Sequence, residues 1–179
     1  MLTSGWYLKQ LQALHNDPKR PQGFGGKVKK LGVLESCMLD WSVTEALDYG
    51  CGKGLMLQHL QQKYPSIQFT GYDPAVEKYE TMPVRNFQML YSVDVLEHIE
   101  PEFLDGVLDN MNHLSNEYLW LRIDTLPARK SLPDGRNAHL ILETPDWWID
   151  KLNIFNGDII YQNYKKGKFD VAIRKTNSR

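Results

Sequence analysis

The chain has 179 residues, of which 42% are hydrophobic, and its net charge is −1. This length suits one domain with a full core, and the near-zero charge gives no electrostatic argument for nucleic acid or a membrane surface as partner. Cys37 and Cys51 lack metal-type spacing, so we expect no disulfide, no metal site and a reducing cytoplasm. We also expect no signal peptide and no membrane span, because no apolar run approaches the roughly 20 residues that a span needs.

Two helices joined by a loop are predicted before the first strand. Residues 4–15 and residues 28–41 both place apolar side chains at helical spacing. The loop between them, residues 16–27, is rich in proline, glycine and basic residues, and Phe24 stands between two glycines. We expect this loop to be either a linker or a flap with Phe24 at its tip.

A short buried strand followed by a glycine turn is the clearest signal in the chain. Residues 45–49 predict the strand, Asp48 lies near its end, and Gly50, Gly52 and Gly54 follow at alternate positions before a helical pattern. Glycines allow a tight turn that a ligand can approach, and the start of the helix favours a carboxylate or phosphate. The dinucleotide fingerprint G-x-G-x-x-G has its third glycine one residue later. A dinucleotide site and a turn without ligand are the alternatives.

A second strand, residues 67–73, ends in Asp73 and is followed by Pro74. Its distance from the glycine turn is about the 20 residues expected for a carboxylate that binds the hydroxyls of a ribose. This position predicts a ligand that contains adenosine. The alternative is a solvent-facing aspartate that merely precedes a proline.

The interval before the next strand is unusually short. Only residues 75–86 separate the second strand from the strand predicted at residues 87–93. A helix, an additional strand and the connecting turns need roughly 25 residues. We therefore predict that the usual third strand and its helix are missing or shortened.

A segment with acidic and imidazole side chains follows the strand at residues 87–93. It reads Asp94-Val95-Leu96-Glu97-His98-Ile99. Titratable groups that crowd the exit of a strand are expected to have shifted pKa values. In the alternative interpretation, Leu96 and Ile99 belong to the core while Glu97 and His98 cap the next helix.

A long loop is predicted at residues 124–139. It follows a helix predicted over residues 101–114 and a central strand predicted over residues 117–123. This loop follows the carboxyl end of a strand, the side on which open α/β sheets bind ligands. It contains five side chains that can donate to sugars, carboxylates or phosphates: Arg129, Lys130, Arg136, Asn137 and His139. An ordinary solvated loop is the alternative.

The last third of the chain predicts a helix and two strands. Thr144 and Pro145 form a typical helix start, with a cap residue followed by proline at the first helical position. Residues 157–164 and 168–174 predict strands joined by a basic turn.

Two of these segments resemble motifs of the class I S-adenosylmethionine-dependent methyltransferases. Asp48-x-Gly50-x-Gly52-x-Gly54 is similar to motif I, and residues 94–99 resemble motif IV. Residues 132–139, Leu-Pro-Asp-Gly-Arg-Asn-Ala-His, with the later Pro-x-Trp-Trp, are similar to a group of bacterial and phage methyltransferases. Members of that group often lie beside enzymes of cell-surface polysaccharides.

The resemblance implies an α/β fold, a Rossmann-like three-layer sandwich with a mostly parallel sheet and an antiparallel C-terminal strand. The third-strand region, which the short interval at residues 75–86 predicts to be missing or shortened, departs from the family pattern. One methyltransferase domain would span residues 1–179, with a helical cap at residues 1–43 and the core at residues 44–175. N-terminal helices of this family often close over the cofactor. Adenine contacts of the family come partly from the region that is short here, which leaves their source open.

The resemblance also implies S-adenosyl-L-methionine as cofactor. The residues implied to hold it are Asp48, Gly50, Cys51, Gly52, Gly54, Asp73, Pro74, Asp94 and Val95. The residues predicted to bind the substrate are Arg129, Lys130, Arg136 and Asn137. For a hydroxyl acceptor, His98 and His139 are the candidate bases, with Asp94 or Glu97 to orient them. An amine or carboxylate acceptor needs no base.

We therefore predict an S-adenosylmethionine-dependent methyltransferase that acts on a small molecule or saccharide-type acceptor. Nucleic acid is a poor acceptor, because the charge is near zero and no Asn/Asp-Pro-Pro-Tyr motif for a flipped base is present. One alternative is a protein that binds the cofactor without catalysis. The other is a Rossmann enzyme that uses NAD or a nucleotide sugar, and the glycine spacing argues against it.

Overall fold

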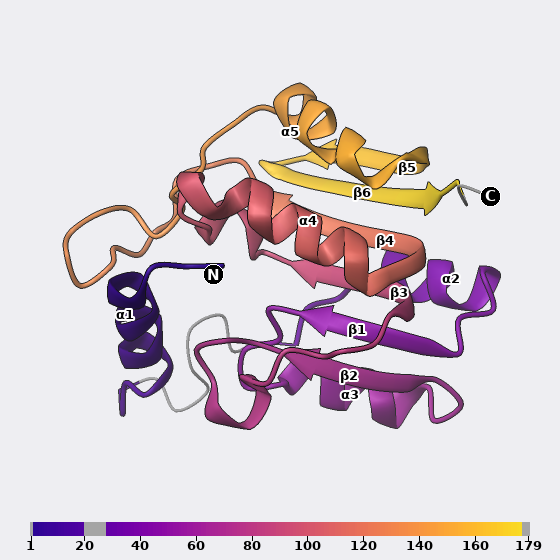
Figure 1. Cartoon of the computed structure of the whole chain (residues 1–179), viewed down its shortest axis with the longest axis horizontal. Coiled ribbons are helices and arrows are strands. Elements are labelled where there is room, and N and C mark those ends of the chain that lie inside the picture. Colours follow the sequence, from indigo (N-terminus) through magenta and orange to yellow (C-terminus); the bar gives the residue numbers. More distant parts are fainter. Residues whose placement is uncertain (1, 20–27, 177–179) are drawn as a thin grey trace.

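The computed structural model describes residues 2–19 and 28–176, and its centre is a six-stranded sheet with the order β2-β1-β3-β4-β6-β5 (Figure 1). The sheet is parallel from β2 to β4, and β6 is antiparallel to both of its neighbours. The strands are β1 (Glu45–Tyr49), β2 (Gln68–Tyr72), β3 (Phe87–Val93), β4 (Ser115–Asp124), β5 (Gly157–Lys165) and β6 (Lys168–Lys175). The predicted α/β fold with a mostly parallel sheet is confirmed.

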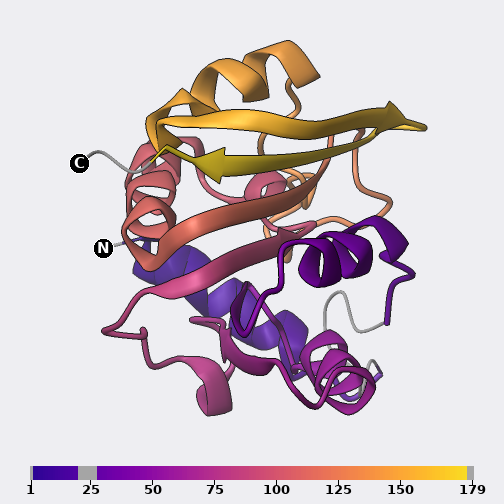
Figure 2. The same ribbon diagram turned by 90° about the vertical axis from the view of Figure 1, so that its right-hand side faces the viewer.

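Helices cover both faces of the sheet (Figures 1 and 2). One face carries α2 (Gly32–Asp40) and α3 (Leu55–Lys63), and the other carries α4 (Leu104–Leu114) and α5 (Pro145–Leu152). Successive strand residues point to opposite faces, so the central strand β4 supplies both cores. Trp120 packs in the core with α2, whereas its neighbours Leu119 and Leu121 pack in the core with α4.

Helix α1 (Gly5–His15) lies beyond the carboxyl ends of the parallel strands, beside the long loop at residues 124–139 (Figure 1). Ser4 caps its first turn by accepting a hydrogen bond from the Tyr7 N–H. The Tyr7 ring is buried against Leu132 and Ala138 of the long loop. The amino-terminal helix and this loop therefore cover the end of the sheet together.

The short interval after β2 contains no strand. Residues 75–86, all of which the structure describes, form only a single turn of 3-10 helix, Glu77–Tyr79. β2 consequently pairs only with β1 and forms an edge of the sheet. The prediction that the third strand is missing is confirmed.

The second helix begins later than its pattern predicts. Residues 28–31 are not helical, and α2 begins at Gly32. This helix packs on a face of the sheet, so of the two described helices that precede β1 it is α1 that lies over the carboxyl ends of the strands. Phe24 and most of the predicted flap lie outside the described residues.

The sequence predicts no disulfide and no membrane span, and both can be compared with the described part of the chain. The thiols of Cys37 and Cys51 are both free. Among the described helices, none has the length and apolar character needed to cross a membrane.

Candidate functional site

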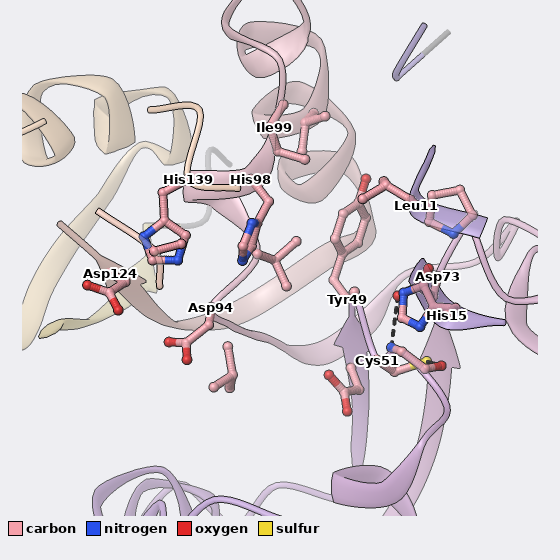
Figure 3. A pocket seen from close by; sticks show the side chains of 18 of the residues that line it. Leu11, His15, Tyr49, Cys51, Asp73, Asp94, His98, Ile99, Asp124 and His139 are labelled. Carbon is pink, nitrogen blue, oxygen red and sulfur yellow. Dashed lines mark hydrogen bonds between the residues drawn. The ribbon is translucent and has the colours of Figure 1, made fainter. Parts of the chain in front are cut away.

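A cavity of about 550 Å³ opens at the carboxyl ends of the parallel strands (Figure 3). Its volume lies within the range of about 300–1,000 Å³ that is typical of sites for small molecules and cofactors. Most of the predicted site residues line it: Asp48, Gly50, Cys51, Gly52, Asp73, Pro74, Asp94, Val95, His98, Arg129, Lys130 and His139. Gly54, Arg136 and Asn137 do not.

The glycine turn and the end of β2 form one unit on one side of this cavity. The N–H of Gly52 donates to Asp73 Oδ2 at 2.8 Å, and the N–H of Ala75 donates to Asp73 Oδ1 at 2.9 Å. Gly50 has a φ of +82°, and a Cβ at this position would lie 2.4 Å from a methyl carbon of Val95. The turn is thus fixed both by the carboxylate and by close packing against the exit of β3.

Gly54, which was predicted to hold the cofactor, does not line the cavity, and it packs closely against another part of the chain. Its φ is +74°, and a Cβ there would lie 2.3 Å from the hydroxyl oxygen of Tyr79. Tyr79 belongs to the short segment that replaces the third strand. The third glycine therefore makes room for a side chain of the protein, and it lies behind the cavity wall.

Burial of Asp48 raises the pKa of its carboxyl group to about 7, and the negative charge of Asp73 adds to this effect. His15, at the end of α1, lines the same part of the cavity, and burial lowers its pKa. The end of the cavity at the glycine turn is therefore acidic and shielded from water. A positively charged ligand group beside Asp48 would favour the ionised carboxylate.

Asp94 lies at the exit of β3 with a φ of +54°, a conformation that is uncommon for a residue other than glycine. Its carboxylate accepts hydrogen bonds from Lys29 and Lys168. Although burial opposes ionisation, Lys29 and then Lys168 hold the pKa of Asp94 below its ordinary value. Lys168 also donates to Asp124 Oδ2 at 2.5 Å, so two lysines and two aspartates form one network.

Glu97 is fully buried and does not cap a helix, contrary to the alternative interpretation of this segment. Its Oε1 accepts the main-chain N–H of Asp124 at 3.1 Å, while its Oε2 has no hydrogen-bond partner among the described residues. Burial, and then the negative charge of Asp94, raise the pKa of Glu97 to about 8. A fully buried carboxyl group with one oxygen unpaired is costly unless a partner completes it.

His98 and His139 lie side by side at the same end of the cavity (Figure 3). Their ring centroids are 4.8 Å apart, and the rings are inclined at 78°. Burial lowers the pKa of His98 to about 4, so this ring is neutral. Nδ1 of His98 lies 2.6 Å from the Ala138 carbonyl oxygen, and Nδ1 of His139 contacts the Leu126 carbonyl. Each Nδ1 therefore carries a proton, and in the neutral ring of His98 the lone pair lies on Nε2.

Two predicted substrate residues instead organise the long loop. Arg136 pairs with Asp134 at 2.9 Å, and its guanidinium lies 5.3 Å from the ring centre of Trp6 on α1. The Asn137 side chain donates to the Ala128 carbonyl and accepts the Ala128 N–H, both at 2.9 Å. These two side chains bind groups of the protein and do not line the cavity. Arg129 and Lys130 are exposed and do line it.

Several cavity residues were not among those predicted: His15, Lys29, Lys53 and Asp124. Asp124 could have been predicted from the sequence as a cavity residue, because like Asp73 it is an acidic residue at the end of a parallel strand. His15 and Lys29 had none, since they reach the cavity from segments that precede the sheet. Only the folded chain brings these N-terminal residues to the strand exits.

A glycine turn tied to a carboxylate at the end of the next strand defines an α/β protein built to hold a nucleoside-containing ligand. A family model described as a methyltransferase domain matches residues 10–169, and the chain belongs to this family. The predicted assignment to the S-adenosylmethionine-dependent methyltransferases is thereby confirmed. No curated protein matches the chain in sequence.

Solved structures of methyltransferases share the fold. The DhpI–SAH complex is 13% identical with a TM-score of 0.66, over 99% of this chain and 100% of the other. Magnesium protoporphyrin IX methyltransferase from Synechocystis PCC 6803 with bound SAM is 13% identical with a TM-score of 0.66, over 93% and 95%. Mitomycin 7-O-methyltransferase MmcR is 13% identical with a TM-score of 0.64, over 93% of this chain and 60% of that longer protein.

Proposed function

We propose that the protein transfers the methyl group of S-adenosylmethionine to a hydroxyl group of a small molecule or saccharide. The observation that carries this proposal is one continuous cavity with two different ends. The glycine turn and Asp73 line one end, and His98 and His139 line the other. Such a cavity suits a donor and an acceptor that meet between the two ends.

The cofactor end fits the proposed donor. When bound, S-adenosylmethionine supplies a methyl group on a positively charged sulfur. The sulfur is the leaving group when an acceptor oxygen attacks the methyl carbon. Asp73 would accept hydrogen bonds from ribose hydroxyls through its remaining lone pairs, since each carboxylate oxygen can accept more than one hydrogen bond. Asp48 would face a positively charged part of the ligand, and residues 50–52 would present their main chain to it. Val95 and Pro74 would complete the wall.

The acceptor end fits a hydroxyl-bearing molecule. His98 and His139 are the groups that would act on the proton of the acceptor, because their Nε2 atoms keep a lone pair. Arg129 and Lys130 line the cavity with exposed donors that suit a sugar, carboxylate or phosphate on the acceptor. Exclusion of water by α1 and the long loop would protect the reaction.

The similar structures support an acceptor of this class. The names of two of these proteins include magnesium protoporphyrin IX and mitomycin, both of which are small molecules. A net charge of −1 gives no support for nucleic acid. Residues 1–179 would form one methyltransferase domain. The two free thiols are consistent with a protein that works in the reducing cytoplasm.

Thermal unfolding with S-adenosylmethionine or NAD tests the cofactor. A ligand at about 100 times its Kd adds roughly 2.7 kcal/mol to the free energy of unfolding, so S-adenosylmethionine should raise Tm by several degrees and NAD should not. An Asp73→Ala variant should lose most of this shift, whereas Asp158→Ala, at an exposed position on β5, should keep it. Stabilisation by NAD alone would overturn the proposal.

Release of S-adenosylhomocysteine, measured over a panel of sugars, phenols and hydroxy acids, tests the catalysis. A hydroxyl acceptor should give turnover together with a methyl ether as product. Cofactor binding with no turnover on any hydroxyl, amine or carboxylate acceptor would favour the non-catalytic alternative.

A further inference from the structure

We propose that Glu97, His98 and His139 form a site for one divalent transition-metal cation at the acceptor end of the cavity. One ligating atom from each residue lies within 4.8 Å of the other two. Donors about 2.0–2.2 Å from a shared cation lie at most about 4.4 Å apart, so a small side-chain rotation would complete the set. Two imidazoles and one carboxylate are a common ligand set that leaves positions open for a substrate.

The main chain brings these three residues together across 42 positions of sequence. The N–H groups of Leu140 and Ile141 both donate to the Glu97 carbonyl, at 2.7 and 3.0 Å. The end of the long loop is thereby attached to the turn after β3. This attachment holds His139 close to Glu97 and His98.

The two imidazoles are oriented as metal ligands usually are. In metal sites, the second ring nitrogen of a ligating histidine generally donates to a carbonyl or carboxylate. Here Nδ1 of His98 lies 2.6 Å from the Ala138 carbonyl oxygen, and Nδ1 of His139 contacts that of Leu126. Both rings therefore present Nε2 as the ligating atom.

The buried carboxylate is an independent observation that points to a ligand. Glu97 is fully buried, and its Oε2 has no partner among the described residues, although Oε1 is satisfied by the Asp124 N–H. Such orphaned oxygens are rare in folded proteins and destabilise them. A cation bound between Oε2 and the two imidazoles would satisfy this atom.

The lysines nearby serve other carboxylates. Lys29 and Lys168 both pair with Asp94, and Lys168 also pairs with Asp124. Neither lysine forms an ion pair with Glu97 among the described residues. Asp94 Oδ1 also lacks a hydrogen-bond partner, but the Asp94 carboxylate has two lysines beside it, whereas Glu97 has no ion pair among the described residues. Glu97 is therefore the carboxylate of this group whose charge a bound cation would balance.

The proposal deepens the proposed function, on which its chemical part rests. With a cation held here, the Nε2 atoms of His98 and His139 would act as its ligands and would not take the acceptor proton. The cation would instead bind the acceptor hydroxyl and lower its pKa, so that the proton is released to solvent. The oxygen lone pair then forms the O–C bond, the C–S bond breaks, and its electron pair stays on sulfur to give S-adenosylhomocysteine. The open positions favour acceptors with two neighbouring oxygens, such as vicinal diols of a saccharide or adjacent phenolic hydroxyls. Imidazole nitrogens favour Zn²⁺ and Co²⁺ over Mn²⁺, and all three over Mg²⁺.

Titration of chelator-stripped protein with Co²⁺ tests the site, by calorimetry and by the visible absorption that reports nitrogen ligation. The wild type should bind one equivalent, and Zn²⁺ should displace it. Glu97→Gln and His139→Ala should each weaken Co²⁺ binding at least tenfold. His59→Ala, which removes an exposed imidazole on α3, should bind as the wild type does.

Thermal unfolding of the same samples separates this inference from the proposed function. Bound Co²⁺ should raise Tm of the wild type and of His59→Ala but not of His139→Ala, whose imidazole lies on a partly exposed loop. Equal Co²⁺ affinity in the wild type and His139→Ala, or no binding at millimolar Co²⁺, would overturn the metal site. If S-adenosylmethionine still stabilises that protein, the proposed function survives. If Co²⁺ binds but S-adenosylmethionine has no effect on Tm, the metal site is supported and the proposed function fails.

Discussion

The two ends of the cavity are built in different ways. The cofactor end comes mainly from one continuous stretch, residues 48–74, in which hydrogen bonds from main-chain N–H groups join the glycine turn to the exit of β2. His15 and Val95 are added to it from other segments. The acceptor end combines side chains from remote segments, with Lys29 from before α2, His98 from after β3 and His139 from the long loop. The first end is held mainly by local geometry, whereas the second depends on the tertiary structure. Substitutions should therefore affect the two ends differently.

Gly50→Ala should have the largest effect, because it combines a positive φ with a contact to Val95 that leaves no room for a methyl group. We expect a loss of up to about 5 kcal/mol in the free energy of unfolding and at least tenfold weaker cofactor binding. Gly135→Ala is the matched control, since its φ is +90° but the space around it is open. Urea unfolding should give a loss of only about 1–2 kcal/mol there. Equal losses would mean that crowding at Val95 does not fix the turn.

Asp48→Asn tests the electrostatics of the cofactor end. Because its pKa is raised to about 7, the folded protein binds a proton that the unfolded chain has lost between about pH 4 and pH 7. The contribution of Asp48 to stability is thus complete below pH 4 and is lost as the pH rises through 7. Asp48→Asn should reduce this fall by up to about 4 kcal/mol, measured by urea unfolding across the range. Asp158→Asn, at an exposed position, should leave it unchanged.

Tyr7→Phe tests how α1 supports the acceptor end. The buried Tyr7 hydroxyl donates to the main-chain carbonyl of His98 at 2.6 Å. Its removal should cost about 1–2 kcal/mol of stability and raise KM for the acceptor more than KM for the cofactor. Tyr164→Phe, which removes an exposed hydroxyl, should change neither value. A larger rise in the cofactor KM would place the influence of α1 at the other end of the cavity.

Two arginines of the long loop should show the smallest and most distinct effects. Arg129→Ala should raise the acceptor KM up to about tenfold without loss of stability, because Arg129 is exposed and lines the cavity. Arg136→Ala should instead cost less than about 1 kcal/mol of stability, since this side chain pairs with Asp134 and lies over Trp6. Steady-state kinetics and thermal unfolding of both variants check this. If Arg136→Ala raised the acceptor KM and Arg129→Ala lowered the stability, Arg136 and not Arg129 would be the substrate contact.

The parts of the fold set by local patterns could be predicted from the sequence. The strand–turn–helix at residues 45–63 was recognisable because apolar alternation and glycine spacing act over few residues. The missing third strand followed from the length of the segment at residues 75–86 alone. The start of α2 was predicted four residues too early, because residues 28–31 have helical spacing but extend toward the sheet. Lys29 pairs there with Asp94, a contact between distant residues that no local pattern encodes.

Side-chain roles in the site were harder to predict for the same reason. The positions of Asp73 and His98 follow from strand exits, and the structure places both at the cavity. The donors Arg136 and Asn137 looked equally suited to a substrate, but their partners are in the loop itself and on α1. The full burial of Glu97 depends on how the long loop folds back over the turn after β3, and its sequence neighbours do not reveal this.

The contacts between α1 and the long loop have a consequence for engineering. Gln10 exchanges two hydrogen bonds with Asp134, and Arg136 lies over Trp6. A chimera that imports only the loop of a relative, in order to change which acceptor is methylated, would leave Gln10 and Trp6 without their partners. Acceptor preference is therefore best transplanted as a cassette of two pieces, residues 2–15 together with residues 124–139, on an unchanged cofactor-binding scaffold.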